Sequence, residues 1–352
     1  MKGIKTSTNT IKLNTIIIFG MFTLLCSNGI FSQTIPMKAI VIVMYESGNI
    51  TGDKAGEAQL WYERDSLIHE MDIAGAYSPL YYNQKGEGLI ITGVGVANAS
   101  STVMALGMNR NLDLSKTYFI IAGIAGTSPN VCTIGSAVWA EWIVDAGMCH
   151  YINPQELPKE WKFSRFRLRC SEPWCEEGAN IGTEVFRLDS ALVQKAYYLT
   201  KNVTLFDSRE AKKIRKNFPK NSIARQDPIV TIGDNLAGST FLFGKITSEW
   251  SDWWVKKWTK GKGTYYTTNM EDNGSLTAFK RLSDSKIICY NRILVLRTAS
   301  NFDQQLPGKD ALESLNDSWV GQIAIENAYR VGSIVVHDII NNWSRWNDKS
   351  SE

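Results

Sequence analysis

Short apolar runs rich in β-branched residues alternate along this chain with segments whose apolar residues have helical spacing. Strands that alternate with helices are typical of α/β folds with a parallel or mixed sheet. The sequence therefore predicts a layered α/β domain with a central mixed β-sheet flanked by helices. Strands are predicted at residues 38–44, 89–94, 118–122, 135–144, 228–233, 264–268 and 292–298, and helices at 57–71, 101–110, 188–198, 207–216, 250–258, 270–282 and 310–343.

The N-terminus is organised like a secretory signal peptide. Three lysines precede an apolar run at residues 16–25, which is too short to span a bilayer, and small or polar residues follow it up to Ser32. Residues 1–32 are therefore expected to be removed by cleavage near Ser32, which makes the mature protein an exported one, periplasmic or secreted. Two alternatives stay open: an uncleaved N-terminal anchor, and a lipoprotein with Cys26 as the lipidated residue.

The charge balance excludes several classes of partner. The chain has 38 basic and 35 acidic residues, and three lysines leave with the signal peptide, so the mature chain is formally neutral. Surfaces that follow nucleic-acid phosphates or anionic membranes need clustered Lys and Arg. No nucleic-acid partner is therefore expected. No apolar run after the signal peptide approaches the length of a membrane-spanning helix, so no transmembrane span is expected in the mature chain.

Residues 149–182 are rich in Trp, Pro and charge and are predicted to be an insertion on the core. Cys170 and Cys175 in this segment are the pair expected to form a disulfide, since exported proteins mature in an oxidising compartment. Free thiols are the alternative. A metal site is not predicted, because a structural zinc needs four ligands and the three histidines of the chain lie far apart in sequence.

Three segments near predicted strand ends carry candidate ligand-binding residues. The first, Asn269-Met270-Glu271, follows the predicted strand at 264–268. A carboxylate such as that of Glu271 can accept hydrogen bonds from two vicinal hydroxyls at once. The alternative interpretation is that Glu271 is an N-terminal helix charge stabilised by the helix dipole.

The second segment is Ser300-Asn301-Phe302-Asp303, after the predicted strand at 292–298. The amide of Asn301 can donate a hydrogen bond to a ligand but cannot supply a proton, whereas the carboxyl of Asp303 can. An Asx-turn that ends the strand would explain the same residues.

The third segment contains Phe241, whose ring could stack on a base, although an ordinary core phenylalanine is the alternative. Gly126, in the glycine-containing segment 123–126, and Ser300 are further candidate ligand contacts. A strand, a glycine turn at 93–101 and a helix also follow one another, an arrangement that points backbone N–H groups at a ligand.

These segments resemble the purine nucleoside permease family, a branch of the nucleoside phosphorylase superfamily, together with residues 41–44, 57–61 and 123–126. The resemblance covers residues 37–346 and implies a single domain with the three-layer nucleoside-phosphorylase-like fold. It implies a purine nucleoside as ligand, with Glu271 on the ribose hydroxyls, Met270 under the sugar and Phe241 on the base. Asn269 and Asn301 stand where the phosphorylases have Glu and a proton-donating Asp. A homodimer is implied by analogy with the superfamily.

One departure from the phosphorylases bears on the reaction. In the phosphorylases the turn equivalent to the one after residues 118–122 carries an Arg and a Ser that bind phosphate, and this chain lacks both. Its turn resembles that of methylthioadenosine nucleosidases, in which a Glu activates water. Glu57 matches this Glu, with Glu46 in reserve, and the alternative interpretation of Glu57 is a solvated helix residue. The sequence therefore predicts cleavage of the N-glycosidic bond by hydrolysis in preference to phosphorolysis. No cofactor is expected, and phosphate as a co-substrate is the alternative to water. The alternatives are a non-catalytic nucleoside-binding component of uptake, and a scaffold without a ligand.

Overall fold

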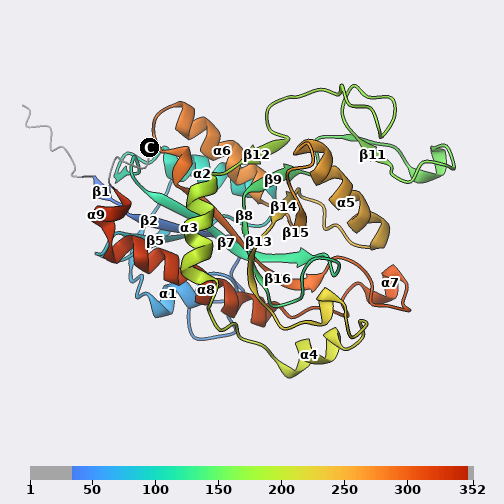
Figure 1. Ribbon diagram of the computed structural model, residues 1–352. Helices are drawn as coiled ribbons and strands as arrows, with labels where there is room; N and C mark the ends of the chain where they lie inside the picture. Colours follow the sequence, from blue (N-terminus) through green and yellow to red (C-terminus); the bar gives the residue numbers. More distant parts are fainter. Residues whose placement is uncertain (1–33, 348–352) are drawn as a thin grey trace, which may run out of the picture. The chain divides into compact units, whose positions relative to one another are not determined.

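In the computed structural model residues 34–347 are described, and the expected signal peptide lies outside them. Their centre is a mixed sheet of 12 strands in the order β12-β9-β14-β15-β7-β2-β5-β4-β3, with β16, β8 and β13 joined to it beside β7 (Figure 1). The strands of this sheet are β2 (Ala39–Val43), β3 (His69–Met71), β4 (Leu80–Tyr82), β5 (Glu87–Ile91), β7 (Tyr118–Thr127), β8 (Ala137–Ala140), β9 (Trp142–Asp145), β12 (Val185–Arg187), β13 (Val230–Ile232), β14 (Asp234–Ala237), β15 (Tyr265–Asn269) and β16 (Ile293–Phe302). The mixed α/β architecture that the sequence predicts is confirmed.

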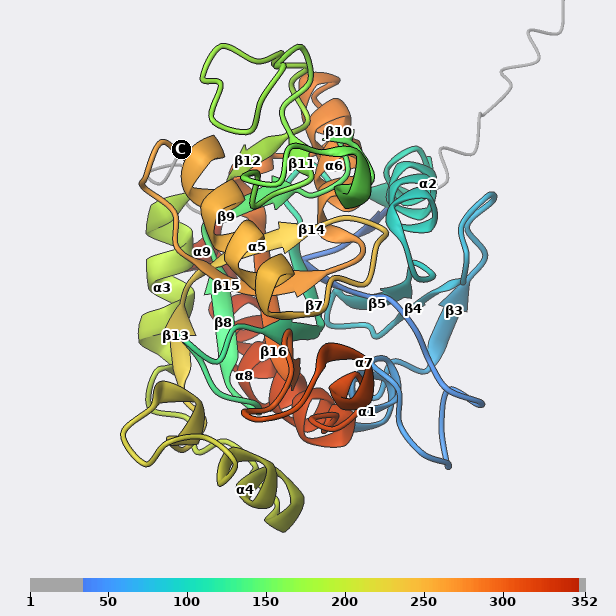
Figure 2. The ribbon, with the colours of Figure 1, turned by 90° about the vertical axis from the view of Figure 1, so that its right-hand side faces the viewer.

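Helices cover both faces of this sheet (Figures 1 and 2). Adjacent residues of a strand point to opposite faces, and at β7 Tyr118 packs against Trp346 of α9 while Phe119 packs against Phe279 of α6. The helices are α1 (Gln59–Arg64), α2 (Val96–Gly107), α3 (Ser190–Thr200), α4 (Arg209–Arg215), α5 (Lys245–Trp258), α6 (Asp272–Asp284), α7 (Ala311–Ser314), α8 (Gly321–Asn341) and α9 (Trp343–Trp346), with short 3-10 turns at Pro154–Glu156, Ile223–Arg225 and Tyr290–Arg292.

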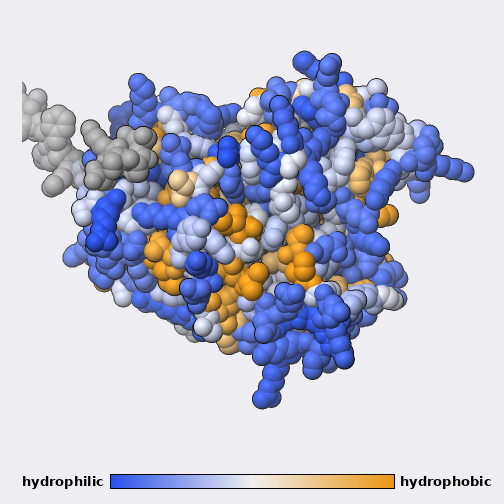
Figure 3. Space-filling view, viewed as in Figure 1, coloured by the Kyte–Doolittle hydropathy of each residue, from blue (hydrophilic) through white to orange (hydrophobic). Residues whose placement is uncertain are grey.

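The longest strands, β7 and β16, are buried along almost their whole length, which explains their continuous runs of apolar and small residues. The helix α8 packs on both of them. The space-filling view of the face that carries α3 and α8 shows a group of apolar side chains near its centre, surrounded by hydrophilic residues (Figure 3). Among the described residues, no helix combines the length and the apolar character that crossing a membrane requires.

The pairing of β7 creates the opening in which the candidate site lies. Along one edge β16 runs parallel to β7 from Phe119 to Thr127. Along the other edge β2 pairs with residues 118–121, and β15 pairs only with residues 126 and 127. Between β2 and β15 the backbone of Ile124 instead accepts and donates hydrogen bonds with side chains. A cavity can therefore form at the end of β2, against the middle of the sheet.

Several element boundaries differ from those predicted. Residues 57–71 do not form one helix, because Ser66 has a positive φ of 55°, which ends the turn after α1, and residues 69–71 pair with β4 as an edge strand. The strand β14 lies where a loop is predicted, and residues 310–343 are divided between α7 and α8. The helix α2 begins at Val96, earlier than predicted.

The predicted turns at 123–126 and 297–303 lie largely within strands β7 and β16. Glycine and serine are typical of turns, but in these segments they are small residues of buried strands.

The segment 149–182 lies outside the large sheet and contributes the small two-stranded sheet of β10 (His150–Tyr151) and β11 (Arg165–Phe166). A second short pair joins β1 (Ile35–Pro36) to β6 (Leu112–Asp113). The predicted disulfide between Cys170 and Cys175 is confirmed. This bond closes a short loop within the segment.

Candidate functional site

A cavity of about 230 Å³ lies at the end of β2, against the middle of β7 and β16. Its walls come from segments that are far apart in sequence, namely the loop before α1, the end of β7, the segment after β14, the turn between β15 and α6, and the end of β16. The cavity is lined by Met44, Tyr45, Glu57, Val94, Ile124, Ala125, Gly126, Thr240, Phe241, Leu242, Thr268, Asn269, Met270, Glu271, Arg297, Ser300, Asn301 and Trp319.

Most of the residues that the sequence singles out meet at this cavity. Glu57, Gly126, Phe241, Asn269, Met270, Glu271, Ser300 and Asn301 all line it. Asp303 is not among the lining residues, and neither is the reserve candidate Glu46.

Glu57 is buried in the wall of the cavity just before α1, with 4% of its surface exposed. Its two carboxylate oxygens accept hydrogen bonds from the backbone N–H groups of Met44 and Ile124, each at 2.7 Å. Burial raises the pKa of this carboxyl to about 7, although Arg297 and the two N–H donors act in the opposite direction. A carboxyl that titrates near neutral pH is suited to general base catalysis.

Glu46 holds the loop that carries Glu57. Its carboxylate accepts hydrogen bonds from the backbone N–H groups of Gly56, Ala58 and Gln59, with distances of 3.0 Å from Ala58 and 2.7 Å from Gln59. These bonds satisfy N–H groups at the start of α1, which otherwise have no partner within the helix. The structure therefore gives Glu46 a supporting position outside the cavity.

Glu271 lies on the opposite wall, at the N-terminus of α6. Its Oε1 accepts a hydrogen bond of 3.3 Å from the N–H of Gly95 at the start of α2, and its Oε2 accepts one of 3.1 Å from the N–H of Met270. Asn269 fixes this turn, because its Oδ1 accepts hydrogen bonds from the N–H groups of Glu271 and Asp272. Asn269 thus caps α6 while it lines the cavity, which the sequence did not indicate.

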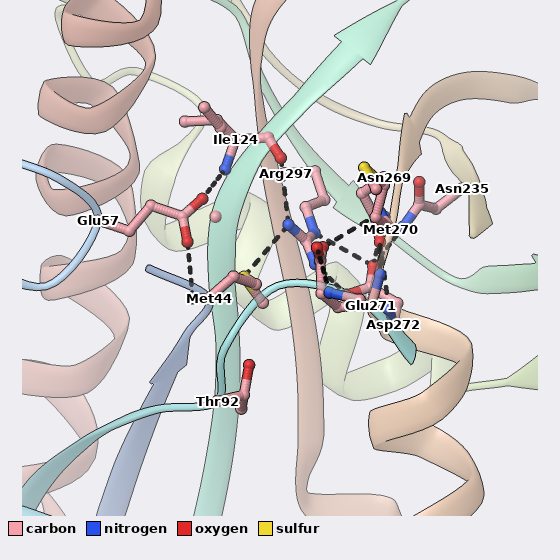
Figure 4. A network of polar contacts seen from close by, with 12 residues as sticks. Met44, Glu57, Thr92, Ile124, Asn235, Asn269, Met270, Glu271, Asp272 and Arg297 are labelled. Carbon is pink, nitrogen blue, oxygen red and sulfur yellow. Dashed lines mark hydrogen bonds and ion pairs between the residues drawn. The ribbon is translucent and has the colours of Figure 1, made fainter. Parts of the chain in front are cut away.

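Arg297 is a functional candidate that the sequence analysis missed. Its guanidinium is 1% exposed and lies against two carboxylates, Asp272 through a short ion pair and Glu271 with 3.4 Å between Nη2 and Oε2 (Figure 4). Burial acts to lower the pKa of Arg297, but these carboxylates outweigh it and raise the pKa, so the side chain stays charged. The clue in the sequence is an arginine inside an apolar strand, since a buried cation needs counter-charges.

Gly123 lets Glu57 and Arg297 approach each other. A Cβ atom on this residue would lie 2.6 Å from Arg297 Nη1, 2.7 Å from Glu57 Oε1 and 2.7 Å from the sulfur of Met44. Figure 4 shows the two charged side chains on either side of the β7 backbone at Ile124, whose carbonyl oxygen accepts a hydrogen bond of 3.1 Å from Arg297 Nη1. Only glycine leaves room for this arrangement.

The end of β16 provides Ser300 and Asn301. The Oγ of Ser300 is 3.1 Å from the carbonyl oxygen of Ala125 and 2.9 Å from Asn301 Oδ1. The Nδ2 of Asn301 donates to the carbonyl oxygen of Phe302 at 2.9 Å. The amide of Asn301 has two N–H donors and two oxygen lone pairs, so one N–H and one lone pair remain for a ligand. Phe241 lines the same cavity and is 51% exposed, so its ring is open to a ligand.

Asp303 lies behind the cavity wall and not at the surface of the cavity. Its Oδ2 accepts a hydrogen bond of 2.7 Å from the hydroxyl of Tyr265, and the residue is 2% exposed. Burial raises the pKa of Asp303 to about 6, against the effect of this hydrogen bond. Asp303 is therefore not placed to contact a ligand directly, and its role as proton donor stays a prediction. The strand β16 continues to Phe302, beyond the predicted end at residue 298. Asp303 therefore directly follows the strand and does not lie in a longer turn at the cavity.

The sequence of this chain matches the family model for purine nucleoside permease over residues 36–351. A probable purine nucleoside permease from Schizosaccharomyces pombe is 31% identical over 307 residues, covering 82% of this chain and 88% of the yeast protein. A purine nucleoside permease from Candida albicans is 29% identical over 318 residues, covering 88% of this chain and 76% of that protein.

The fold is similar to that of solved nucleosidases. A Helicobacter pylori methylthioadenosine nucleosidase variant, crystallised with 5'-methylthioadenosine in its active site, superposes with a TM-score of 0.50 at 13% identity, covering 86% of this chain and 99% of the nucleosidase. This likeness supports the nucleoside-phosphorylase-like fold that the sequence predicts. The match of the family model and the yeast relative decide the family: this chain belongs to the purine nucleoside permease family.

Proposed function

We propose that the cavity binds a purine nucleoside and that the protein hydrolyses its N-glycosidic bond. Such a reaction passes through an oxocarbenium-like state and needs a base for the attacking water and a clamp on the sugar. The observation that carries the proposal is Glu57, a buried carboxyl with a pKa of about 7, in the same cavity as Glu271 and Asn301. In this proposal Glu57 removes a proton from water as the water attacks the anomeric carbon. The bond from this carbon to the purine nitrogen breaks, and the departing purine, hydrogen-bonded by Asn301, takes up a proton from solvent.

Glu271 and Arg297 form the sugar-binding side of the proposed site. Glu271 accepts hydrogen bonds from vicinal ribose hydroxyls, and Arg297 holds its carboxylate in place with 3.4 Å between Nη2 and Oε2. Burial raises the pKa of Glu271, while Arg297 lowers it, so the guanidinium favours the ionised carboxylate that a hydroxyl clamp needs. Phe241 and Asn301 face the base in this arrangement, Phe241 by stacking and Asn301 by hydrogen bonding.

The charges of the cavity favour water over phosphate as the nucleophile. Within residues 34–347, Arg297 is the only basic side chain that lines the cavity, and it is already paired with Asp272 and Glu271. A phosphate dianion would meet the carboxyls of Glu57 and Glu271 without a free cation to balance it. Phosphorolysis would therefore require the protein to separate an existing buried ion pair.

The test is an assay of the purified mature protein with inosine, adenosine and guanosine, with and without phosphate. Hydrolysis gives free base and ribose in both conditions, whereas phosphorolysis gives base and ribose 1-phosphate only when phosphate is present. Chromatography of the base and a reducing-sugar assay distinguish the products. The absence of free base after long incubation of a folded protein would refute the hydrolytic proposal.

A second candidate function is nucleoside binding without cleavage, as a component of uptake. Two observations favour it: the relatives from both yeasts are named permeases, and Asn301 offers an amide where an acid would be needed to protonate the leaving base. Calorimetry that detects binding of inosine while chromatography detects no base would select this function.

We also propose that the protein is exported after cleavage near Ser32, on the basis of the N-terminal sequence. The Cys170–Cys175 disulfide supports this location, since disulfides persist in oxidising compartments. The intact mass of protein recovered from the periplasm or medium would test it. A homodimer is a related proposal, which light scattering of the mature protein would test.

A further inference from the structure

Three ionisable side chains meet at a surface hollow that shares no lining residue with the nucleoside cavity. Asp65 follows the end of α1, Glu87 begins β5, and His337 lies on α8. One ligand atom from each of them lies within 4.8 Å of the others. The three segments come from distant parts of the sequence, which is why counting histidine spacings did not reveal the cluster.

The carboxylates of this cluster are buried and incompletely satisfied. Glu87 is 3% exposed, and its Oε1 has no hydrogen-bond partner among the described residues. The side chain of Asp65 is 4% exposed, and its Oδ2 likewise lacks a partner within residues 34–347. Buried carboxylate oxygens without a donor are costly, because desolvation is not repaid by a hydrogen bond. Both orphaned oxygens belong to the residues that would hold a ligand.

The remaining oxygens and the histidine are held in fixed positions. Tyr329 donates its hydroxyl hydrogen to Asp65 Oδ1 at 2.9 Å, and Nδ2 of Asn83 donates to Glu87 Oε2 at 3.2 Å. His337 Nε2 lies 2.8 Å from Asp65 Oδ1. The bonds from Tyr329 and Asn83 are of the kind that orient carboxylate ligands of metal ions. The two carboxylates are therefore buried and held by hydrogen bonds, unlike acidic side chains that lie free at the surface.

The cluster lacks a strong positive partner from the protein. Arg64 lines the hollow, but its guanidinium pairs with Glu326 at 2.8 Å. Lys85 also lines the hollow, and within residues 34–347 no ion pair joins it to Asp65 or Glu87. The negative charge of Asp65 and Glu87 must therefore be balanced by bound protons or by a cation.

We propose that Asp65, Glu87 and His337 bind a divalent transition-metal ion of the Zn²⁺ type. One imidazole nitrogen and two carboxylates are ligands that zinc accepts, and the half-exposed His337 leaves a further position for water. Ligand atoms about 2 Å from a zinc ion lie about 3–3.5 Å apart, so binding draws the three side chains together. The ion replaces the proton between His337 and Asp65 and any proton on Glu87, and these protons pass to solvent.

The proposed ion would join α1, β5 and α8. The loop that precedes α1 carries Glu57, so the metal would fasten the segment next to the nucleoside cavity without entering it. Its effect is therefore expected on stability, and the inference does not depend on the proposed hydrolysis.

The experiment uses the mature full chain, stripped with chelator and then dialysed against Zn²⁺ or Co²⁺. Elemental analysis should find about one metal per chain, Co²⁺ should give a visible absorption band, and saturating Zn²⁺ should raise Tm by about 2–4 °C. His337→Gln should lose all three effects while its circular dichroism stays unchanged. The matched control is His150→Gln, which removes an exposed histidine of the segment 149–182 and should keep them.

The alternative is that the carboxylates simply share a proton. In that case the wild-type protein would bind no more metal than His337→Gln, and Tm would not respond to Zn²⁺, which would overturn the proposal. Metal that persists in both His337→Gln and Glu87→Gln would belong elsewhere, and it would overturn the proposal equally. Loss of the metal from both variants, with retention by His150→Gln, would establish the site.

Discussion

Arg297 and Glu271 face each other with 3.4 Å between Nη2 and Oε2, and both side chains are almost completely buried. The same guanidinium pairs with Asp272, which is also buried. Arg297 thus links the middle of β16 to the start of α6 in the wall of the cavity. One cation pairs with two carboxylates in this arrangement, so the stability of the protein and the geometry of the proposed sugar-binding wall depend on the same residue.

Arg297→Met should destabilise the protein by about 3–5 kcal/mol, because it leaves Asp272 and Glu271 buried without a counter-charge. Urea unfolding followed by circular dichroism measures the change. Arg64→Met is the matched control, since Arg64 forms an ion pair while its side chain is 40% exposed, and such a pair contributes at most about 1 kcal/mol. Equal effects of the two substitutions would contradict the structural role of the Arg297 cluster.

Glu57→Gln should lower the rate of nucleoside hydrolysis by about 10²–10⁴-fold, the usual contribution of a general base. The amide cannot accept the proton of water, but its size is unchanged, so the Kd for nucleoside should stay within a few-fold. Chromatographic kcat and calorimetric Kd separate the two effects. Glu63→Gln, in the exposed part of the adjoining helix, should leave both unchanged. A full rate in the Glu57 variant would remove this residue from the mechanism.

The hydrolytic rate should rise with pH to a plateau. Glu57 acts as a base only when ionised, and its pKa is raised to about 7, so the rate should fall about tenfold per unit below that value. The contribution of Glu57 to the free energy of unfolding changes with pH in the opposite direction to the rate. It is fully present below the ordinary pKa of 4.5 and is lost as pH rises through about 7. A rate that does not vary between pH 5 and 8 would argue against Glu57 as the base.

Gly123→Ala should reduce activity strongly, on the order of 10²-fold, because misplacing a catalytic group by about 1 Å has this effect. The new Cβ would lie 2.7 Å from Glu57 Oε1 and 2.6 Å from Arg297 Nη1, so one of them must move. The rate and Tm should be measured together. Gly147→Ala is the control, since its Cβ would meet Asp145 at an ordinary 3.5 Å. An unaffected rate in Gly123→Ala would show that the crowding is relieved without moving Glu57.

Phe241→Ala should weaken nucleoside binding by roughly 10-fold or more, since stacking of a base on an aromatic ring contributes about 1–3 kcal/mol. Calorimetry with inosine measures the change. Phe206→Ala removes another partly exposed phenylalanine that does not line the cavity, and it should leave Kd unchanged. If both variants bind equally well, the base does not stack on Phe241.

Local sequence was a good guide to the strands and to the side chains at their ends. The buried strand predicted at 38–44 appears as β2, and the segments around Phe241, Glu271 and Asn301 do line one cavity. Periodicity and residue type suffice for these features because they depend on neighbours along the chain. The resemblance to the purine nucleoside permease family then predicted a role for each of these residues, which composition alone does not indicate.

Features that depend on long-range contacts were not predictable in this way. The counter-charges of Arg297, Glu271 and Asp272, lie at the N-terminus of α6, 26 and 25 residues away, and only the folded chain shows the ion pairs. The glycine and serine residues of β7 and β16 resemble turn residues, yet burial between helices keeps them in strands. The position of Asp303 likewise depends on how far β16 continues, which local propensity does not determine.

The distance in sequence between Glu57 and Asn301 has a consequence for truncated chains. The walls of the cavity are completed by β16 and by Trp319 beyond it, so a chain truncated before residue 301 lacks part of the wall. Any ligand of this cavity would therefore bind only to chains in which the segments on both sides of residue 301 have folded together.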